Sequence, residues 1–127
     1  MDGILLFDKP LGWTSHDAVD FLRRRLKQKK IGHAGTLDPL ATGLLVMLVG
    51  SATKLSEKLM GLDKDYRGSI RLGQVTETWD LEGKIVSEKP YGHIGSQDVE
   101  DTLRSLTGEQ TITPPVYSAI KKDGKRL

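Results

Sequence analysis

The apolar run from Leu44 to Val49, "LLVMLV", restricts the possible folds of this chain more than any other segment. Gly43 and Gly50 bound the run, and no charged residue interrupts it. It is far shorter than the roughly 20 apolar residues that a helix needs to cross a bilayer. A short apolar run between glycines is typical of a strand that is buried on both faces. We therefore expect a buried strand at this place.

Hydrophobic periodicity predicts the other elements, which alternate irregularly. Strands are predicted at 4–7, 64–76 and, after a turn near Glu82 and Gly83, 84–89. The segment 112–122 is expected to be extended around Pro114 and then to form a strand. Irregular alternation indicates an α+β (mixed α/β) fold rather than a strict series of βαβ units.

Three segments have the apolar spacing of helices. The first, 12–28, has Thr14 or Ser15 as its candidate N-cap. The second is a short helix at 51–62. The third begins with Ser96 as N-cap and ends at Gly108, which is typical of a residue that follows a helix.

A glycine-rich loop at 31–43 places Asp38 directly before Pro39 and among small and apolar residues. The residue before a proline is disfavoured in helical conformation, so an extended or turn conformation is expected for Asp38. A carboxylate with reduced hydration at a rigid loop can act as a nucleophile or a base. The alternative is that Asp38 caps a helix that starts at Pro39. The local sequence leaves both interpretations open.

Composition and short motifs exclude several classes of site. The chain has no cysteine, so disulfides, thiolate metal sites and a cysteine nucleophile are excluded. The phosphate-binding and dinucleotide-binding glycine motifs are missing, and the three histidines are scattered without ligand spacing. We expect no metal and no nucleotide cofactor. The short apolar start and the lack of a membrane-spanning run predict a soluble, cytoplasmic protein.

Positive charge is concentrated although the net charge is only +2. The run "RRRLKQKK", from Arg23 to Lys30, contains six cations and no anion. A cluster of this kind can attract phosphate groups, or it can be the solvated face of a helix. A second basic segment, "KKDGKRL", lies at the end of the chain.

Four segments together resemble one enzyme family. "GHAGTLDPLATGLL" resembles the catalytic motif of the TruB-type tRNA pseudouridine synthases. "DKPLGWTSHDAV", "KDYRGSIRLGQVTETWDLEG" and "PPVYSAIKKDGKRL" are similar to three further motifs of that family, and the four stand in the family's order. The resemblance implies a mixed, largely antiparallel sheet with flanking helices, and chemistry that uses neither cofactor nor metal.

The resemblance also implies a reaction and a substrate. Family members convert uridine to pseudouridine in RNA, and the bacterial ones act on the T-loop uridine of tRNA (position 55 of that RNA). Asp38 matches the family's catalytic aspartate. The carboxylate could attack the anomeric carbon, add to carbon 6 of the base or remove a proton from the sugar, and the sequence leaves the three routes open.

Further site residues follow from the resemblance. Tyr66 matches the tyrosine that stacks on the flipped base, although an isolated strand tyrosine is more often a core residue. His33 matches a histidine near the extruded nucleotide. Lys9, Lys64 and Asp80 match positions near the site, where supporting roles are expected above direct chemistry. The candidate phosphate contacts of the basic run are Arg23, Arg24, Lys27, Lys29 and Lys30.

Two family features lie outside these residues: an arginine that pairs with the aspartate, and a C-terminal RNA-binding domain of the PUA type. We therefore expect residues 1–127 to be the N-terminal portion of a catalytic domain, inactive or weakly active alone, and the full-length enzyme to be a monomer. An alternative is a non-catalytic RNA-binding or RNA-chaperone fragment with the same fold. A third possibility is an unrelated α/β protein in which Asp38 caps a helix.

Overall fold

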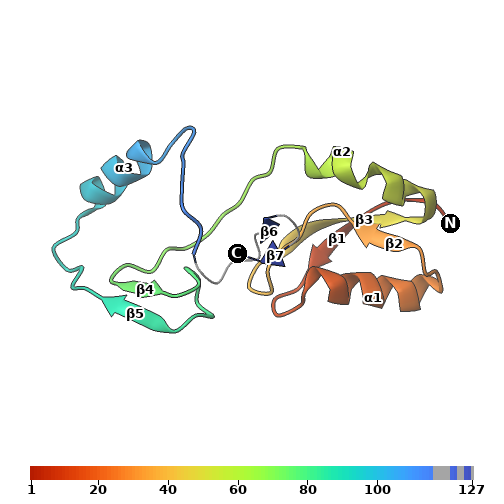
Figure 1. Ribbon diagram of the computed structural model, residues 1–127, viewed down its shortest axis with the longest axis horizontal. Helices are drawn as coiled ribbons and strands as arrows, with labels where there is room; N and C mark the ends of the chain where they lie inside the picture. The colour runs from red at the N-terminus through yellow and green to blue at the C-terminus, as the bar shows by residue number, and fades with distance from the viewer. Residues whose placement is uncertain (116–120, 123–124, 127) are drawn as a thin grey trace. The chain divides into compact units, whose positions relative to one another are not determined.

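The computed structural model describes the backbone of all residues except 116–120, 123–124 and 127. The chain forms two compact units, which we call unit 1 (Met1–Tyr66) and unit 2 (Arg67–Leu127). Figure 1 labels the elements of both units.

Unit 1 contains a three-stranded antiparallel sheet in the order β1-β3-β2. Its strands are β1 (Gly3–Lys9), β2 (Ile31–His33) and β3 (Gly43–Val49). The central strand β3 is the predicted apolar run, and it pairs from Gly3 opposite Val49 to Lys9 opposite Gly43. Its central position explains why so many consecutive residues are apolar, because both of its faces are covered.

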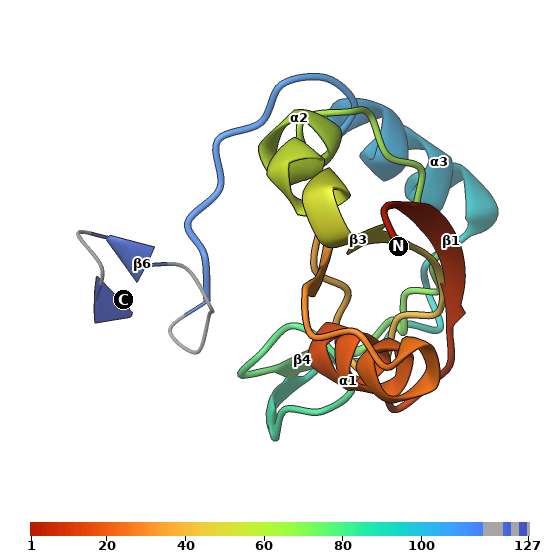
Figure 2. The ribbon, with the colours of Figure 1, turned by 90° about the vertical axis from the view of Figure 1, so that its right-hand side faces the viewer.

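Helix α1 (Ser15–Leu26) covers one face of this sheet, as Figures 1 and 2 show. Alternate residues of a strand point to the same face, and those of β3 on this side pack against the apolar stripe of the helix. The resulting core comprises Ala18, Val19, Leu22, Ile31, Leu45, Met47 and Val49. Leu37 packs against the edge of this core and connects it to the loop that carries Asp38.

The opposite face is covered by a 3-10 helix, η1 (Gly50–Leu55), which continues into α2 (Ser56–Met60) (Figure 2). Ala34, Leu48 and Ala52 form a smaller core there, and Val46 and Leu59 pack against it. The prediction that the apolar strand is buried on both faces is confirmed for Leu45 and for Met47 to Val49, whereas Val46 is half-buried and Leu44 is 63% exposed. The short helix predicted at 51–62 is present in this divided form.

Local hydrogen bonds set both ends of α1. Thr14 is the N-cap: its hydroxyl accepts from the Asp17 N–H, and the Asp17 carboxylate accepts from the Thr14 N–H. This capping box satisfies two amides that the first helical turn leaves free. At the other end, Lys27 adopts a left-handed conformation (φ 50°) and its N–H donates to the Arg23 carbonyl. The sequence predicts this helix correctly.

Unit 2 contains an antiparallel hairpin of β4 (Gln74–Thr76) and β5 (Ile85–Glu88), with an irregularity between Val75 and Thr76. Helix α3 (Ser96–Ser105) follows. Strands β6 (Lys121–Lys122) and β7 (Lys125–Arg126) form a second antiparallel pair. All strand pairs among the described residues are antiparallel, which agrees with the α+β fold and the largely antiparallel sheet expected from the sequence.

Several boundaries differ from the predictions. The strand predicted at 64–76 is present only as β4, because none of the other described strands pairs with 64–73 and an unpaired strand leaves its amides to water. The loop predicted at 31–43 begins with the short strand β2. Gly95, not Ser96, is the N-cap of α3, and its N–H donates to Asp98. Much of the strand expected after Pro114 lies outside the described residues.

Among the residues that the structure describes, no helix combines the length and the hydrophobicity required to cross a membrane.

Candidate active site

Asp38 occupies the first position of a four-residue turn between β2 and β3. The Ala41 N–H donates to the Asp38 carbonyl at 2.9 Å, and Pro39 occupies the second position, which suits its restricted φ. No helix begins at Pro39, so the interpretation of Asp38 as a helix cap is wrong. The side chain of Asp38 is exposed, so the reduced hydration expected from its neighbours is not found in this chain.

The residues on either side of Asp38 are held by the first residue of α1 and by the segment that precedes this helix. The Ser15 hydroxyl accepts from the Leu37 N–H at 2.8 Å and donates to the Leu37 carbonyl at 3.1 Å. The Gly12 N–H donates to the Pro39 carbonyl at 2.8 Å. The Asp38 backbone is therefore fixed immediately before and immediately after the exposed carboxylate.

Lys9 lies at the end of β1 and is completely buried. Its ammonium group donates to the main-chain carbonyls of Trp13, at 2.5 Å, and Pro10, at 3.1 Å. A buried ammonium is unfavourable without such partners. Lys9 therefore connects the end of the strand to the segment that holds the Asp38 loop, which favours the expected supporting role.

His33 and Lys64 form a second group of candidate residues in unit 1. The half-buried His33 ring contacts the Gly35 carbonyl at 2.6 Å through Nδ1, which must carry the proton because a carbonyl only accepts. The side chain of Lys64 lies 3.9 Å from the position that a Cβ on Gly35 would occupy. Its ammonium donates to the carbonyls of Met60 and Leu62, at the end of α2.

Tyr66 is 69% exposed and lies in a segment without regular secondary structure. This exposure excludes the role of an ordinary core aromatic for Tyr66 in the described chain. Its ring is accessible to a planar partner, although the surrounding strand expected from the sequence is not formed.

The cations of the basic run differ in their surroundings: Arg23 forms hydrogen bonds within the protein, whereas several others are exposed. Arg23 is half-buried: Nη1 donates to Asp20 Oδ1 at 3.1 Å, Nε to the Lys29 carbonyl at 3.1 Å and Nη2 to the Ile31 carbonyl at 3.3 Å. Its guanidinium group thus holds the turn between α1 and β2. Four other candidate phosphate contacts of this run are exposed: Arg24, Lys27, Lys29 and Lys30.

Asp80 organises the hairpin turn of unit 2. Its carboxylate accepts from the Thr78 hydroxyl at 2.6 Å and from the Glu82 N–H at 2.9 Å. These bonds hold the pKa of Asp80 below its ordinary value because they stabilise the charged form, and the bond from the Thr78 hydroxyl has the largest effect. Trp79, just before it, has a positive φ of 64° and is 59% exposed. The geometry of Asp80 is that of a structural residue of the turn.

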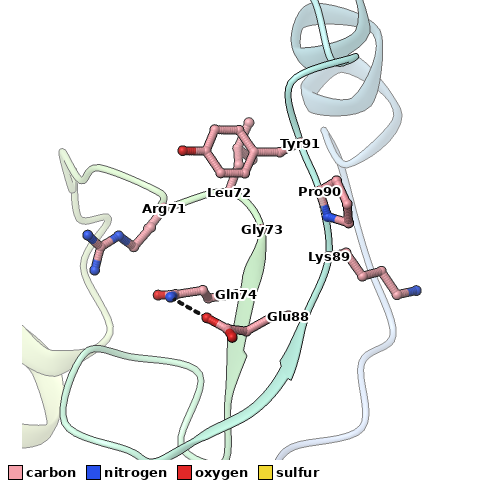
Figure 3. Close-up of a pocket in the computed structure, with 8 residues that line it drawn as sticks. All are labelled: Arg71, Leu72, Gly73, Gln74, Glu88, Lys89, Pro90 and Tyr91. Carbon is pink, nitrogen blue, oxygen red and sulfur yellow. Dashed lines mark hydrogen bonds between the residues drawn. The ribbon is translucent and has the colours of Figure 1, made fainter.

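A shallow hollow in unit 2 lies where the hairpin strands meet their flanking segments (Figure 3). Gln74 and Glu88 are joined across it by a hydrogen bond of 2.8 Å. Tyr91 packs directly on Gly73, whose φ is +85°, and a Cβ there would come within 2.5 Å of the ring. The hollow therefore requires glycine at this position.

Comparison with known proteins identifies the family. Residues 23–127 match the profile described as TruB family pseudouridylate synthase (N terminal domain). The chain belongs to the TruB family. The resemblance inferred from the four sequence motifs is therefore confirmed.

Relatives extend the similarity over the whole chain. It is 50% identical over 127 residues to the tRNA pseudouridine synthase B of Opitutus terrae, and 52% identical over 127 residues to that of Syntrophotalea carbinolica. All of this chain is covered in both cases, but only 53% and 42% of those proteins. The chain thus spans about half the length of the curated TruB relatives that it matches.

A solved structure is similar in fold. The crystal structure of a Cbf5-Nop10-Gar1 complex contains a chain that matches with a TM-score of 0.62 and 24% identity. The match covers 94% of this chain and 31% of that one. At this identity the similarity concerns the fold, and it agrees with the architecture expected for a TruB protein.

The roles of Ser15 and Gly12 in this TruB chain are not predicted by the sequence. The sequence makes Ser15 a candidate helix cap, but Thr14 takes that position and leaves the Ser15 hydroxyl for Leu37. The two positions are far apart in sequence, and no local pattern indicates their contact. The burial of Ser15, at 3% exposure, is known only from the structure.

Proposed function

We propose that this chain carries the catalytic aspartate of a tRNA pseudouridine synthase, which converts the T-loop uridine of tRNA (position 55 of that RNA) to pseudouridine. The main support is the position of Asp38: it is the aspartate of the family motif, and it lies exposed on a turn whose backbone is held on both sides. The relatives that match this chain over its full length are named tRNA pseudouridine synthase B.

The reaction breaks the bond between the anomeric carbon and N1 of uracil and forms a bond from the same carbon to C5. The hydrogen on C5 leaves as a proton and N1 takes up a proton, so the product is an isomer of the substrate and the atoms balance without an oxidant or a reductant. An ionised carboxylate can assist by attacking the anomeric carbon, by adding to C6 or by removing a sugar proton. Each route needs an accessible carboxylate, and the exposed Asp38 meets that requirement.

Two other side chains are proposed to act on the flipped base. The exposed ring of Tyr66 is suited to stack on the uracil, with its hydroxyl near the proton that leaves C5. His33, held to the Gly35 carbonyl, is a planar side chain that could occupy the space left by the extruded nucleotide. Filling that gap offsets part of the unstacking free energy of base flipping.

Exposed cations of the basic run are proposed to bind RNA phosphates. Arg24, Lys27, Lys29 and Lys30 are accessible for this role, whereas Arg23 is engaged within the protein. Lys9, Lys64 and Asp80 are proposed to support the site, because each bonds groups of its own neighbourhood. The whole protein is proposed to be a monomer and to act in the cytoplasm.

The isolated chain of 127 residues is proposed to have little turnover. Among the described residues, no cation forms an ion pair with Asp38, and the chain spans about half of its relatives. The family's paired arginine and its PUA-type domain are proposed to lie in a C-terminal part of the protein. A poorly oriented carboxylate lowers the rate because the reacting atoms are seldom aligned.

An Asp38→Asn variant tests the proposal. Asparagine keeps the size of the side chain but can act neither as nucleophile nor as base. The proposal predicts that the intact protein binds a T-arm stem-loop and forms pseudouridine, and that the variant binds it without forming product. Binding by both with product from neither would favour the non-catalytic RNA-binding alternative.

A further inference from the structure

Ser15 is almost completely buried, with 3% of its surface exposed. One hydroxyl satisfies both main-chain groups of Leu37, accepting from the N–H at 2.8 Å and donating to the carbonyl at 3.1 Å. Leu37 directly precedes Asp38 in the chain. A displacement of Leu37 therefore displaces the Asp38 carboxylate.

We propose that Ser15 is a positioning residue for Asp38, whose hydroxyl sets the place of the carboxylate in the active site. This inference rests on the proposed function, in which Asp38 is catalytic. Ser15 does not touch the substrate in this account. It acts through the backbone of Leu37 and thus determines how closely Asp38 approaches the reacting sugar and base.

Other contacts keep the loop attached when the hydroxyl is removed. The Leu37 side chain packs against the core between the sheet and α1. The Gly12 N–H still holds the Pro39 carbonyl at 2.8 Å. Removal of the hydroxyl leaves two polar groups of Leu37 without a partner, and these recover hydrogen bonds by shifting toward water. The expected result is a folded protein with a misplaced carboxylate.

Small displacements matter more to the rate than to substrate binding. A misplacement of about 1 Å can slow an enzymatic reaction by about 100-fold. The binding of tRNA depends on many contacts other than this carboxylate. Loss of the Ser15 hydroxyl should therefore lower kcat and leave KM nearly unchanged.

The test uses the intact protein that carries this sequence, with Ser15→Ala and a matched control, Thr53→Val. Thr53 also donates from its hydroxyl to a main-chain carbonyl, that of Gly50 at 2.8 Å, but it makes no bond to residues 37–39. Turnover is measured on a T-arm stem-loop. Hydrogen exchange of the Leu37 amide reports whether the loop has been released.

We expect Ser15→Ala to lower kcat by about 10- to 100-fold with KM little changed, and to accelerate exchange of the Leu37 amide. Thr53→Val should keep the kcat of the unmodified protein. Unchanged kcat or unchanged Leu37 exchange in Ser15→Ala would overturn the inference. An equal loss of kcat in Thr53→Val would do the same, since it would indicate a general effect of lost stability.

If Ser15→Ala does not fold, Ser15→Cys is used to test the role of the Ser15 hydroxyl. The thiol fills a similar volume but forms much weaker hydrogen bonds. A folded Ser15→Cys protein with lowered kcat would support the inference, and one with full kcat would overturn it. Asp38→Asn separates the two proposals: turnover that survives this change refutes the proposed function, whereas its loss together with full activity in Ser15→Ala refutes only the role of Ser15.

Discussion

The buried ammonium of Lys9 donates to the main-chain carbonyl of Trp13 at 2.5 Å, which joins the end of β1 to the segment that leads into α1. Gly12 and Ser15, on either side of Trp13, hold the loop that carries Asp38. A lysine within the core thus stabilises the segment on which the candidate catalytic loop rests.

Replacement of Lys9 by methionine should lower stability. The change keeps an unbranched apolar side chain but leaves the carbonyls of Pro10 and Trp13 without their donor. We expect the free energy of unfolding of the intact protein to fall by about 1–3 kcal/mol, measured by urea denaturation. Lys54→Met, at an exposed position of η1, is the control. Equal stability of the two variants would contradict this role of Lys9.

Titration of Asp80 should report its hydrogen bond to Thr78. Because the folded pKa of Asp80 is lowered, its contribution to stability is present above the unfolded pKa of about 3.9 and is lost as the pH falls through the folded pKa. Thr78→Val should raise the midpoint of the Asp80 carboxyl, measured by NMR. Thr76→Val removes a bond to the Asp80 carbonyl instead and should not raise it. If Thr78→Val left the Asp80 midpoint unchanged, the Thr78 hydroxyl would not be the cause of the lowered pKa.

Arg23 and Arg24 should have separable effects although they are adjacent. Arg23→Ala removes two hydrogen bonds at the connection between α1 and β2 and one to Asp20 within α1, and it should lower the free energy of unfolding by about 1–2 kcal/mol. Arg24→Ala should preserve stability and reduce the slope of log K against log salt for RNA binding by about 0.7–0.9. Binding titrations at several salt concentrations check this. The reverse pattern would contradict the division of roles.

The isolated 127-residue chain should bind T-arm RNA but modify it only slowly. We expect its single-turnover rate to be at least about 100-fold below that of the intact protein, because the groups that we propose to pair with Asp38 would then be missing. Comparable rates for the two would show that these residues suffice for catalysis.

The sequence predicts those elements whose signals are local. The strand β1, the helix α1 with an N-cap at Thr14 or Ser15, the apolar strand β3 and the β4–β5 hairpin all follow from periodicity and turn residues. Of the strand expected at 64–76 only β4 is present, because a strand also needs a partner to pair with and hydrophobic alternation alone does not supply one. Strand prediction is limited by such non-local contacts.

The candidate site shows the same division. Family motifs identify Asp38, but an aspartate before a proline is compatible with both a turn and a helix start, and only the fold distinguishes them. The link between Ser15 and Leu37 joins residues 22 positions apart and has no signature in the sequence. Hydrogen bonds between residues so far apart in sequence can be identified only from the folded structure, in which α1 packs on the sheet.

The most direct test of the account is tritium release from a T-arm stem-loop that carries uridine labelled at C5, with the intact protein and its Asp38→Asn variant. We predict release by the unmodified protein and none by the variant, at equal RNA binding. Release that is unaffected by Asp38→Asn, or no release by either protein, would contradict the assignment of Asp38 as the catalytic residue of a tRNA pseudouridine synthase.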